Sequence, residues 1–353
     1  MTLITLDTKS WAAGLTAAAD AYRLFGPVRE DACHTFKALE KGKTPDLDMV
    51  NTRLSPKALI FPQSDIILEY SLDESREDHH IMREVQKDVT PRAVVGIRPC
   101  DAKATALVKL NFDAPDVKDP YWLAAYEATT FVGVACDAPL STCFCTTAGC
   151  GPYSEEGLDI LVMQKGDGFL AKILTDKGRA FAKAAGWNPA GGDLAAFEAG
   201  KAAAEKKMVS AVQTDHLEAA DLLALHNAPF WEKTAFACLN CGTCTFSCPT
   251  CWCFDLQDEV AGKSGVRLKN WDSCMFPIFT VHTTGHNPRE TKVQRVRQRF
   301  MHKLKYFVDK YKTGIMCVGC GRCVRQCPVN IDIRKVCEEM NRFNPADACA
   351  VRD

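Results

Sequence analysis

The sequence predicts an α/β N-terminal domain with a mixed sheet, followed by an all-α (helical) C-terminal domain. Short apolar runs alternate with helical patterns over residues 1–186, which is the arrangement expected of an α/β layer structure. The composition changes near residue 187 to Ala, Gly, Glu and Lys, and a cysteine-rich region begins near residue 229. A chain of 353 residues has room for two domains of ordinary size.

The elements of the N-terminal domain follow from its hydrophobic pattern. Short apolar runs bounded by polar or turn residues predict buried strands at residues 57–62, 93–97, 131–135 and 159–163. Apolar residues at helical spacing predict helices at residues 10–24, 101–110 and 177–186. Because both kinds of element alternate along the chain, we expect a mixed sheet covered by helices.

Two further regions complete the predicted organisation. Residues 187–228 begin with the helix breakers Gly191 and Gly192 and continue as a helix-prone Ala, Glu and Lys stretch, which indicates a helical connector. Residues 229–353 form the predicted α-helical domain. Within it, Val293, Val296 and Phe300 recur at helical spacing and predict a helix over residues 289–312.

Charge and hydropathy exclude several classes of protein. Lys and Arg total 43 against 44 Asp and Glu, whereas a general nucleic-acid binder normally carries a marked basic excess. No apolar run approaches the eighteen or so residues that a membrane-spanning helix needs. Residues 1–11 lack a basic start followed by a hydrophobic stretch. We therefore expect a cytoplasmic protein with no membrane span and no nucleic-acid partner.

Cysteine is the compositional outlier, with 19 residues. The cytosol keeps thiols reduced, so structural disulfides are not expected. Three cysteines stand alone and fit the role of small buried hydrophobes: Cys33, Cys337 and Cys349. Most of the others form three groups: Cys136, Cys143, Cys145 and Cys150; Cys238, Cys241, Cys244, Cys248, Cys251 and Cys253; and Cys317, Cys320, Cys323 and Cys327. Metal binding explains this clustering.

Two of the groups contain the same motif, C-x2-C-x2-C-x3-C-P, which is typical of proteins with two [4Fe–4S] clusters. Gly242 and Gly321 follow the second cysteine of each run and permit the positive φ that a tight turn around a cluster needs. In two-cluster ferredoxins, the fourth cysteine of each run binds the other cluster. The predicted ligands are therefore Cys238, Cys241, Cys244 and Cys327 for cluster 1, and Cys317, Cys320, Cys323 and Cys248 for cluster 2. Zinc is the alternative, but zinc ribbons use two cysteines per arm.

The other cysteines leave alternatives open. The loop that contains Cys136, Cys143, Cys145 and Cys150 follows a predicted strand, so it could hold a third [4Fe–4S] cluster, a zinc ion, a redox-active pair or inert thiols. Cys100 ends another predicted strand, so the two loops could meet at one sheet edge. Cys251, Cys253 and Cys274 are either packing thiols or ligands to a further centre. The imidazoles of His282, His286 and His302 are interpreted as polar contacts.

The helix predicted at 289–312 carries nine Lys or Arg residues against Glu290 and Asp309. This pattern fits a solvated basic face, a positive lining that eases cluster reduction, or a docking face for an acidic partner. A dinucleotide-binding G-x-G-x-x-G is absent, so no flavin or NAD site is expected in this chain. Gly42-Lys43-Thr44 and Gly262-Lys263-Ser264 look like fragments of a phosphate loop, but each lacks the glycine five residues earlier.

Several motifs extend this interpretation to most of the chain. They are Cys248-Pro-Thr-Cys-Trp-Cys-Phe-Asp255, Trp271-Asp-Ser-Cys274, Gly285-His-Asn-Pro-Arg289, Cys317-Val-Gly-Cys-Gly-Arg-Cys323, Phe61-Pro62, Gly96-Ile-Arg-Pro-Cys-Asp101, and Cys143-Phe-Cys145 with Gly151-Pro152. In these motifs the chain resembles the iron–sulfur (beta) subunits of sulfhydrogenases, the corresponding iron–sulfur subunits of anaerobic sulfite reductases, and electron-transfer subunits associated with heterodisulfide reductases. Trp252 stands where many of these proteins have His.

The resemblance implies an electron-relay subunit of a cytosolic anaerobic oxidoreductase complex. Such a subunit passes electrons between a flavoprotein that binds FAD and NAD(P)H and a catalytic subunit of the hydrogenase, sulfite or sulfur reductase, or heterodisulfide reductase type. The helical insert between the two motifs points to an all-α ferredoxin-like C-terminal domain, and we expect the subunit not to be catalytic itself. The alternative is a reductase that acts on a sulfur substrate at Cys143 and Cys145 or at a third metal site.

Overall fold

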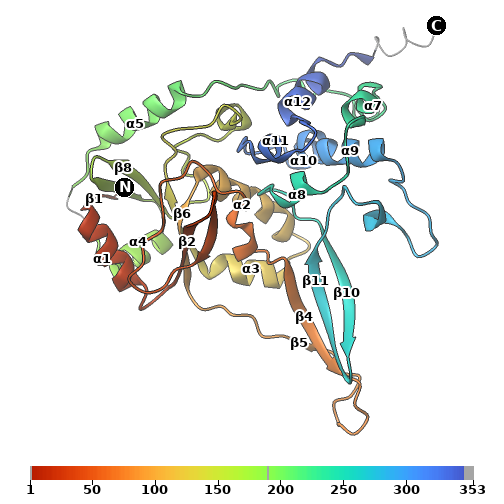
Figure 1. Cartoon of the computed structure of the whole chain (residues 1–353), viewed down its shortest axis with the longest axis horizontal. Coiled ribbons are helices and arrows are strands. Elements are labelled where there is room, and N and C mark those ends of the chain that lie inside the picture. The colour runs from red at the N-terminus through yellow and green to blue at the C-terminus, as the bar shows by residue number, and fades with distance from the viewer. Residues whose placement is uncertain (1, 189–190, 346–353) are drawn as a thin grey trace.

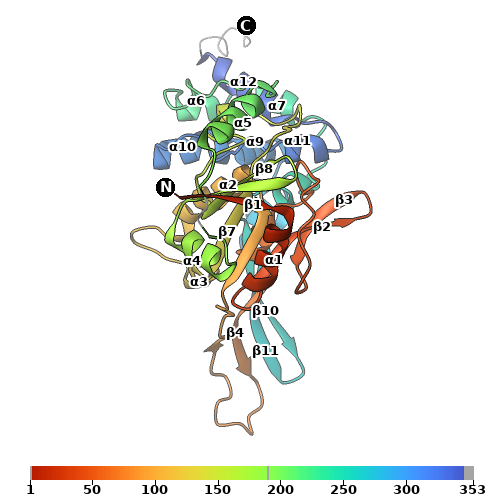
Figure 2. The same ribbon diagram turned by 90° about the vertical axis from the view of Figure 1, so that its left-hand side faces the viewer.

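The computed structural model describes residues 2–188 and 191–345, so Cys349 lies outside the described residues. A seven-stranded mixed sheet dominates the N-terminal half (Figures 1 and 2). Its strand order is β1 (Thr2–Asp7), β9 (Gly168–Ile173), β8 (Ile160–Lys165), β7 (Thr129–Val134), β6 (Arg92–Ile97), β2 (Arg23–Glu30) and β3 (Cys33–Ala38). The central strands β2, β6, β7 and β8 are parallel, and the outer pairs are antiparallel.

Helices cover both faces of this sheet, and this explains the continuous apolar runs of its central strands. On one face, α1 (Thr8–Ala18) and α4 (Asp176–Ala184) pack Trp11 and Phe181 against Val95 and Val132. On the other face, α2 (Pro99–Phe112) and α3 (Pro120–Glu127) pack against Val94, Phe131 and Leu161. Adjacent residues of a strand face opposite sides of the sheet, so both faces must be apolar. The predicted mixed sheet is confirmed.

The described part of the connector and the C-terminal region contain short helices. They are α5 (Leu194–Lys206), α6 (Leu222–His226), α7 (Phe230–Ala235), α8 (Thr243–Phe246), α9 (Lys292–Met301), a π-helical turn (His302–Tyr306), α10 (Phe307–Tyr311), α11 (Arg322–Gln326) and α12 (Ile333–Arg342). The helix α9 begins with a capping box between Thr291 and Gln294 and continues through the π turn into α10. In Figure 1, α7 to α9 and α11 to α12 gather at one end of the molecule.

The prediction of an all-α C-terminal domain is wrong. Residues between the two cysteine motifs form a long β-hairpin of β10 (Phe254–Ala261) and β11 (Ser264–Trp271). This hairpin joins β4 (Ser64–Ser71) and β5 (Arg83–Glu84) in a four-stranded sheet, order β10-β11-β4-β5. The sheet extends away from the body of the molecule and unites strands from both halves of the chain (Figure 1).

One predicted strand of the N-terminal half is also wrong. Residues 57–62 do not form a strand. Pro56–Leu59 make a 3₁₀ turn instead, and Pro62 follows three residues after its end. Ile60 and Phe61 are nevertheless buried in the core, which accounts for the apolar run. Among the described residues, no helix has the length and apolarity that a bilayer crossing demands.

Candidate metal centres

The two C-x2-C-x2-C-x3-C-P motifs fold in the same way. Each wraps through a left-handed glycine, with φ of 73° at Gly242 and 70° at Gly321, directly before a short helix that carries the third cysteine. The predicted positive φ at both glycines is therefore confirmed. The helices α8 and α11 contact each other, so the two cysteine runs form one unit.

The first group of thiols combines both runs. Cys238, Cys241, Cys244 and Cys327 line one cavity, together with Cys323 from the neighbouring group. Backbone amides point at the sulfurs: Asn240 N–H donates to Cys238 Sγ (3.4 Å) and Ile331 N–H donates to Cys327 Sγ (3.2 Å). Such bonds stabilise thiolate charge and tune cluster potentials. The structure thus brings Cys327 to the first three cysteines of the other run.

The second group lies directly beside the first. Cys248, Cys317, Cys320 and Cys323 line a second cavity. Cys248 Sγ is 3.3 Å from Thr250 Oγ1, whose hydroxyl donates to the carbonyl of Met316 (2.9 Å). Here it is the fourth cysteine of the first run that reaches the second run. In each cavity, three cysteines of one run are thus joined by the fourth cysteine of the other run.

Buried cations surround these thiols, and the sequence pattern alone did not single them out. Arg299 and Lys303 are each 4% exposed, and Arg299 lines both cavities. Lys303 Nζ donates to Thr250 Oγ1 (2.7 Å), and an Arg299 N–H donates to the carbonyl of Cys244 (3.4 Å). Burial opposes their charge, yet the nearby thiolates, including Cys244 near Arg299 and Cys248 near Lys303, raise the pKa of both groups. These cations therefore require anions beside them.

The chemistry of the donor set fits iron–sulfur clusters. Thiolates are the ligands that such clusters use, and eight of them with two buried cations suit a pair of anionic clusters. Burial raises the pKa of Cys244 to about 11 and that of Cys320 to about 12, so binding must release their protons. No group of three or more His, Cys, Asp or Glu among the described residues is compact enough for one metal ion. A cubane instead distributes its ligands over four irons.

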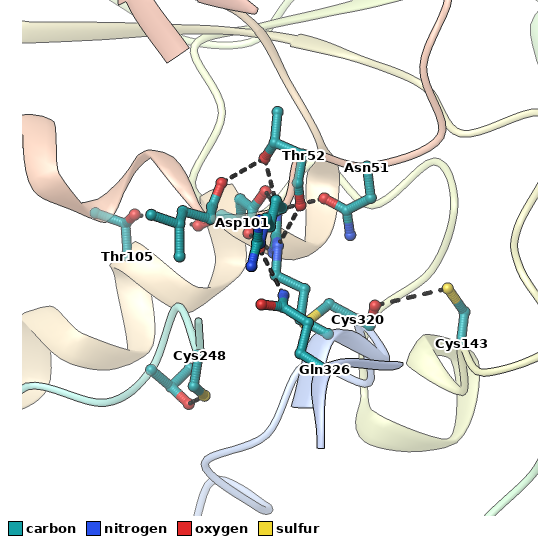
Figure 3. A network of polar contacts seen from close by, with 12 residues as sticks. Asn51, Thr52, Asp101, Thr105, Cys143, Cys248, Cys320 and Gln326 are labelled. Carbon is teal, nitrogen blue, oxygen red and sulfur yellow. Dashed lines mark hydrogen bonds and ion pairs between the residues drawn. The ribbon is translucent and has the colours of Figure 1, made fainter. Parts of the chain in front are cut away.

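The loop with the third group of cysteines packs against the second motif. Phe144 N–H donates to the carbonyl of Gly319 (2.9 Å), and the Cys143 thiol donates to the carbonyl of Cys320 (3.7 Å; Figure 3). A Cβ at Gly319 would lie 2.5 Å from the Cys145 backbone, so only glycine fits. Burial, together with Cys150, Cys143 and Cys136, raises the pKa of Cys145. Cys150 N–H donates to the carbonyl of Cys145 (2.9 Å) and Cys136 N–H donates to the carbonyl of Pro152 (3.0 Å), so the loop folds back on itself and keeps these cysteines in one region.

A buried ion pair links the second motif to the edge of the large sheet. Arg322, which follows Gly321 in the motif, bonds to both carboxylate oxygens of Asp101 (2.5 and 2.7 Å), and the two side chains are 0% and 1% exposed. Its guanidinium also donates to Thr52 O (2.9 Å) and Asn51 (Figure 3). Cys100 precedes Asp101, and Arg98, two residues before Cys100, donates to the carbonyl of Ala135 (2.5 Å), directly before Cys136. The two loops thus meet at the sheet edge, as predicted.

The three cysteines left open by the sequence lie together at the base of the β-hairpin. Cys251, Cys253 and Cys274, which we call the hairpin-base cysteines, line a cavity of about 310 Å³. The imidazole of His302 lines the same cavity, and burial with nearby cations lowers its pKa to about 4. His282 and His286 are exposed, and their rings lie edge to face with centroids 5.4 Å apart.

Comparison with known proteins agrees with this site. Residues 237–331 match a family model described as a 4Fe-4S dicluster domain. These residues hold both motifs, so the site and the match define an iron–sulfur protein that binds [4Fe–4S] clusters.

A curated relative identifies the family. Sulfhydrogenase 2 subunit beta of Pyrococcus furiosus is 30% identical over 328 residues, which cover 90% of this chain and 92% of the relative. The chain belongs to the family of iron–sulfur beta subunits of sulfhydrogenases and is an iron–sulfur electron-transfer subunit. No solved structure matches it significantly.

Proposed function

We propose that this chain is an electron-relay subunit of an anaerobic cytoplasmic oxidoreductase complex. It would accept electrons from a flavoprotein subunit that binds FAD and NAD(P)H and deliver them to a catalytic subunit, or carry them in the reverse direction. The observation that carries the proposal is the adjacency of the two thiol groups, which share Arg299 as a common wall. Two clusters held so close together suit transfer rather than bond-making chemistry.

The proposed ligands of cluster 1 are Cys238, Cys241, Cys244 and Cys327, and those of cluster 2 are Cys317, Cys320, Cys323 and Cys248. The cavity linings and the exchanged fourth cysteines support this assignment. Cys136, Cys143, Cys145 and Cys150 remain the proposed ligands of a further [4Fe–4S] cluster, supported by their place in one loop that folds back on itself. The clusters, when bound, supply the electron-accepting chemistry.

The chain's own residues set the conditions for that chemistry. Arg299 and Lys303 place positive charge beside the clusters, which favours the reduced and more negative state. Their burial limits screening by water and salt, so the effect is strong. The amides that donate to Cys238 and Cys327 act in the same direction.

A sulfur-reductase activity at Cys143 and Cys145 receives less support. Both thiols are 7% exposed, and Cys143 is engaged with the Cys320 carbonyl. A substrate needs an open position beside the reacting group, and the relay function needs none.

The proposed function is tested with the isolated chain, prepared anaerobically. We expect it to contain no stoichiometric flavin and to stay oxidised when NADH or NADPH is added alone. Addition of the flavoprotein subunit should make the clusters reducible, as followed by bleaching of their visible absorption. Rapid bleaching by NADH without a partner would contradict the relay function.

The ligand assignment has its own test. Cys248→Ser should damage the cluster bound by Cys317, Cys320 and Cys323, and leave the cluster of its sequence neighbours Cys238, Cys241 and Cys244 intact. EPR spectra of variants in each run identify the two signals. Loss of the signal that depends on Cys241 would show that the fourth cysteines are not exchanged.

A further inference from the structure

The β-hairpin creates a group of thiols that the linear sequence separates. Cys251 and Cys253 directly precede β10, and Cys274 follows β11. The first residue of β10, Phe254, pairs with the last residue of β11, Trp271, and Asp272 N–H donates to the carbonyl of Cys253 (3.0 Å). Antiparallel pairing therefore closes the hairpin at its base and brings Cys274 beside Cys253.

The cavity at this base is large enough for more than a single ion or water. Its volume of about 310 Å³ compares with about 30 Å³ and about 20 Å³ for the cavities of the first and second groups. A single water needs only about 10–15 Å³ measured in this way. The lining combines the three thiols with the cations Arg289, Arg299 and Lys303. This composition suits a bulky anionic group bound by sulfur.

We propose that the hairpin-base cysteines bind an additional [4Fe–4S] cluster, with His302 as the ligand of the fourth iron. Three thiolates give such a cluster a negative charge, and the buried Arg299 and Lys303 balance it. The only imidazole on the lining is that of His302. This residue opens the π-helical turn His302–Tyr306, and π turns inside helices occur frequently at functional sites.

The position of this centre connects it to the relay. Thr250, Arg299 and Lys303 line both this cavity and that of the second cysteine group. The hairpin-base centre would therefore be separated from cluster 2 only by side chains that line both cavities, a short path for electron transfer. The proposal goes beyond the two-cluster relay, which needs none of the hairpin-base cysteines.

The test measures iron and acid-labile sulfide in the full-length, anaerobically prepared chain and in two matched variants. Cys253→Ala should lose about four irons per chain, the content of one cubane. Cys337→Ala, which removes a lone buried thiol elsewhere in the same half, should lose none. Unchanged iron in Cys253→Ala, or zinc in place of iron, would overturn the proposal. A wild-type chain that lacks the eight irons of clusters 1 and 2 would instead contradict the proposed relay.

A second variant keeps the test valid if Cys253→Ala folds poorly. His302→Ala removes no thiolate, so it should keep the three irons that the thiolates bind and lose at most about one iron per chain. The EPR signal of one cluster should change, and those of the clusters identified by Cys241 and Cys320 variants should not. Spectra identical to the wild type would overturn the assignment of His302 as a ligand.

Discussion

The seven-stranded sheet and the cysteine-rich region are stabilised in different ways. The centre of the sheet is purely apolar: Val94, Val95, Val132 and Leu161 are all 0% exposed between two layers of helices. The cysteine-rich region instead buries thiols together with Arg299, Lys303 and Arg322. The first arrangement is stabilised mainly by the hydrophobic effect, whereas the second contains charges that are costly without partners.

The difference shows that the sheet region needs no bound group to balance its buried side chains, whereas the cysteine-rich region does. Arg322 has Asp101, whereas Arg299 donates to the Cys244 carbonyl and lies over the Phe300 ring, and Lys303 donates to the Thr250 hydroxyl. Their charge balance must come from thiolates and bound clusters. The clusters are thus expected to be structural as well as redox-active.

Removal of iron should have the largest effect, and it separates the two regions. After anaerobic chelation, each buried cation left without a partner should cost about 3–5 kcal/mol, so the cysteine-rich region should open. Hydrogen exchange would detect this as lost amide protection in α8, α9 and α11. The strands β6, β7 and β8 should keep their protection. Equal loss of protection in both regions would contradict the claim that only the cysteine-rich region depends on bound iron.

Disruption of the buried ion pair between Arg322 and Asp101 should have the second largest effect. Arg322→Met leaves Asp101 buried and unpaired, which should lower the free energy of unfolding by about 3–5 kcal/mol. Denaturant titration of the iron-loaded chain measures this loss. A matched control is Arg325→Met, which changes an exposed arginine of the same helix and should alter stability by less than about 0.5 kcal/mol. Equal losses of stability in the two variants would show that the Arg322–Asp101 ion pair does not stabilise the contact between the two halves.

Arg299→Met should change redox behaviour more than stability. Loss of this buried positive charge should make reduction harder, because at an effective dielectric constant near 20 a unit charge at a separation of about 8 Å contributes on the order of 2 kcal/mol, or roughly 90 mV. Redox titration monitored by EPR gives the potentials. The exposed Lys310 on the same continuous helix provides the control Lys310→Met, for which a shift close to zero is expected. A positive shift in Arg299→Met would contradict the account.

The smallest effect is expected at a cysteine that binds nothing. Cys337 is 1% exposed within an apolar cluster, and its thiol donates to the carbonyl of Gln213 (3.4 Å). Cys337→Ala should cost about 1 kcal/mol of stability and leave the iron content and the potentials unchanged. Thermal unfolding and iron analysis would test both parts. A loss of iron would mean that lone thiols also serve the clusters.

The sequence predicted the parts of the fold whose pattern is local. The runs that became β6, β7 and β8 are apolar because helices cover both faces of the sheet, and this leaves a clear signal. The run at 57–62 looked the same, but Pro56 and Pro62 exclude a central strand and its apolar residues reach the core from a turn.

The hairpin was missed because its outer strand carries almost no apolar signal. Most of Phe254–Ala261 is exposed, and it contains three acidic residues. A turn signal was nevertheless present. Gly262-Lys263, which resembled a phosphate-loop fragment, is the two-residue turn between the pair Ala261 and Ser264, with φ of 62° at Gly262.

The candidate site also contains one part that a local sequence pattern predicts and another part that depends on the fold. The grouping of the eight motif cysteines around two cavities could be predicted, because the motif has a fixed spacing that suits a cubane. Cys251, Cys253 and Cys274 could not be grouped, because their proximity depends on the hairpin. Arg299 and Lys303 looked like members of a basic helix, and only the fold shows which of its nine basic residues face the thiols.

The most direct test of the central claim is the iron inventory of the wild-type chain. Mössbauer spectroscopy of anaerobically prepared, iron-57-labelled protein should find at least about eight irons per chain, all in [4Fe–4S] clusters. Cys241→Ser and Cys320→Ser should each reduce the inventory by about four irons, from different clusters. A chain that contains zinc, or fewer than eight cluster irons, would contradict the account.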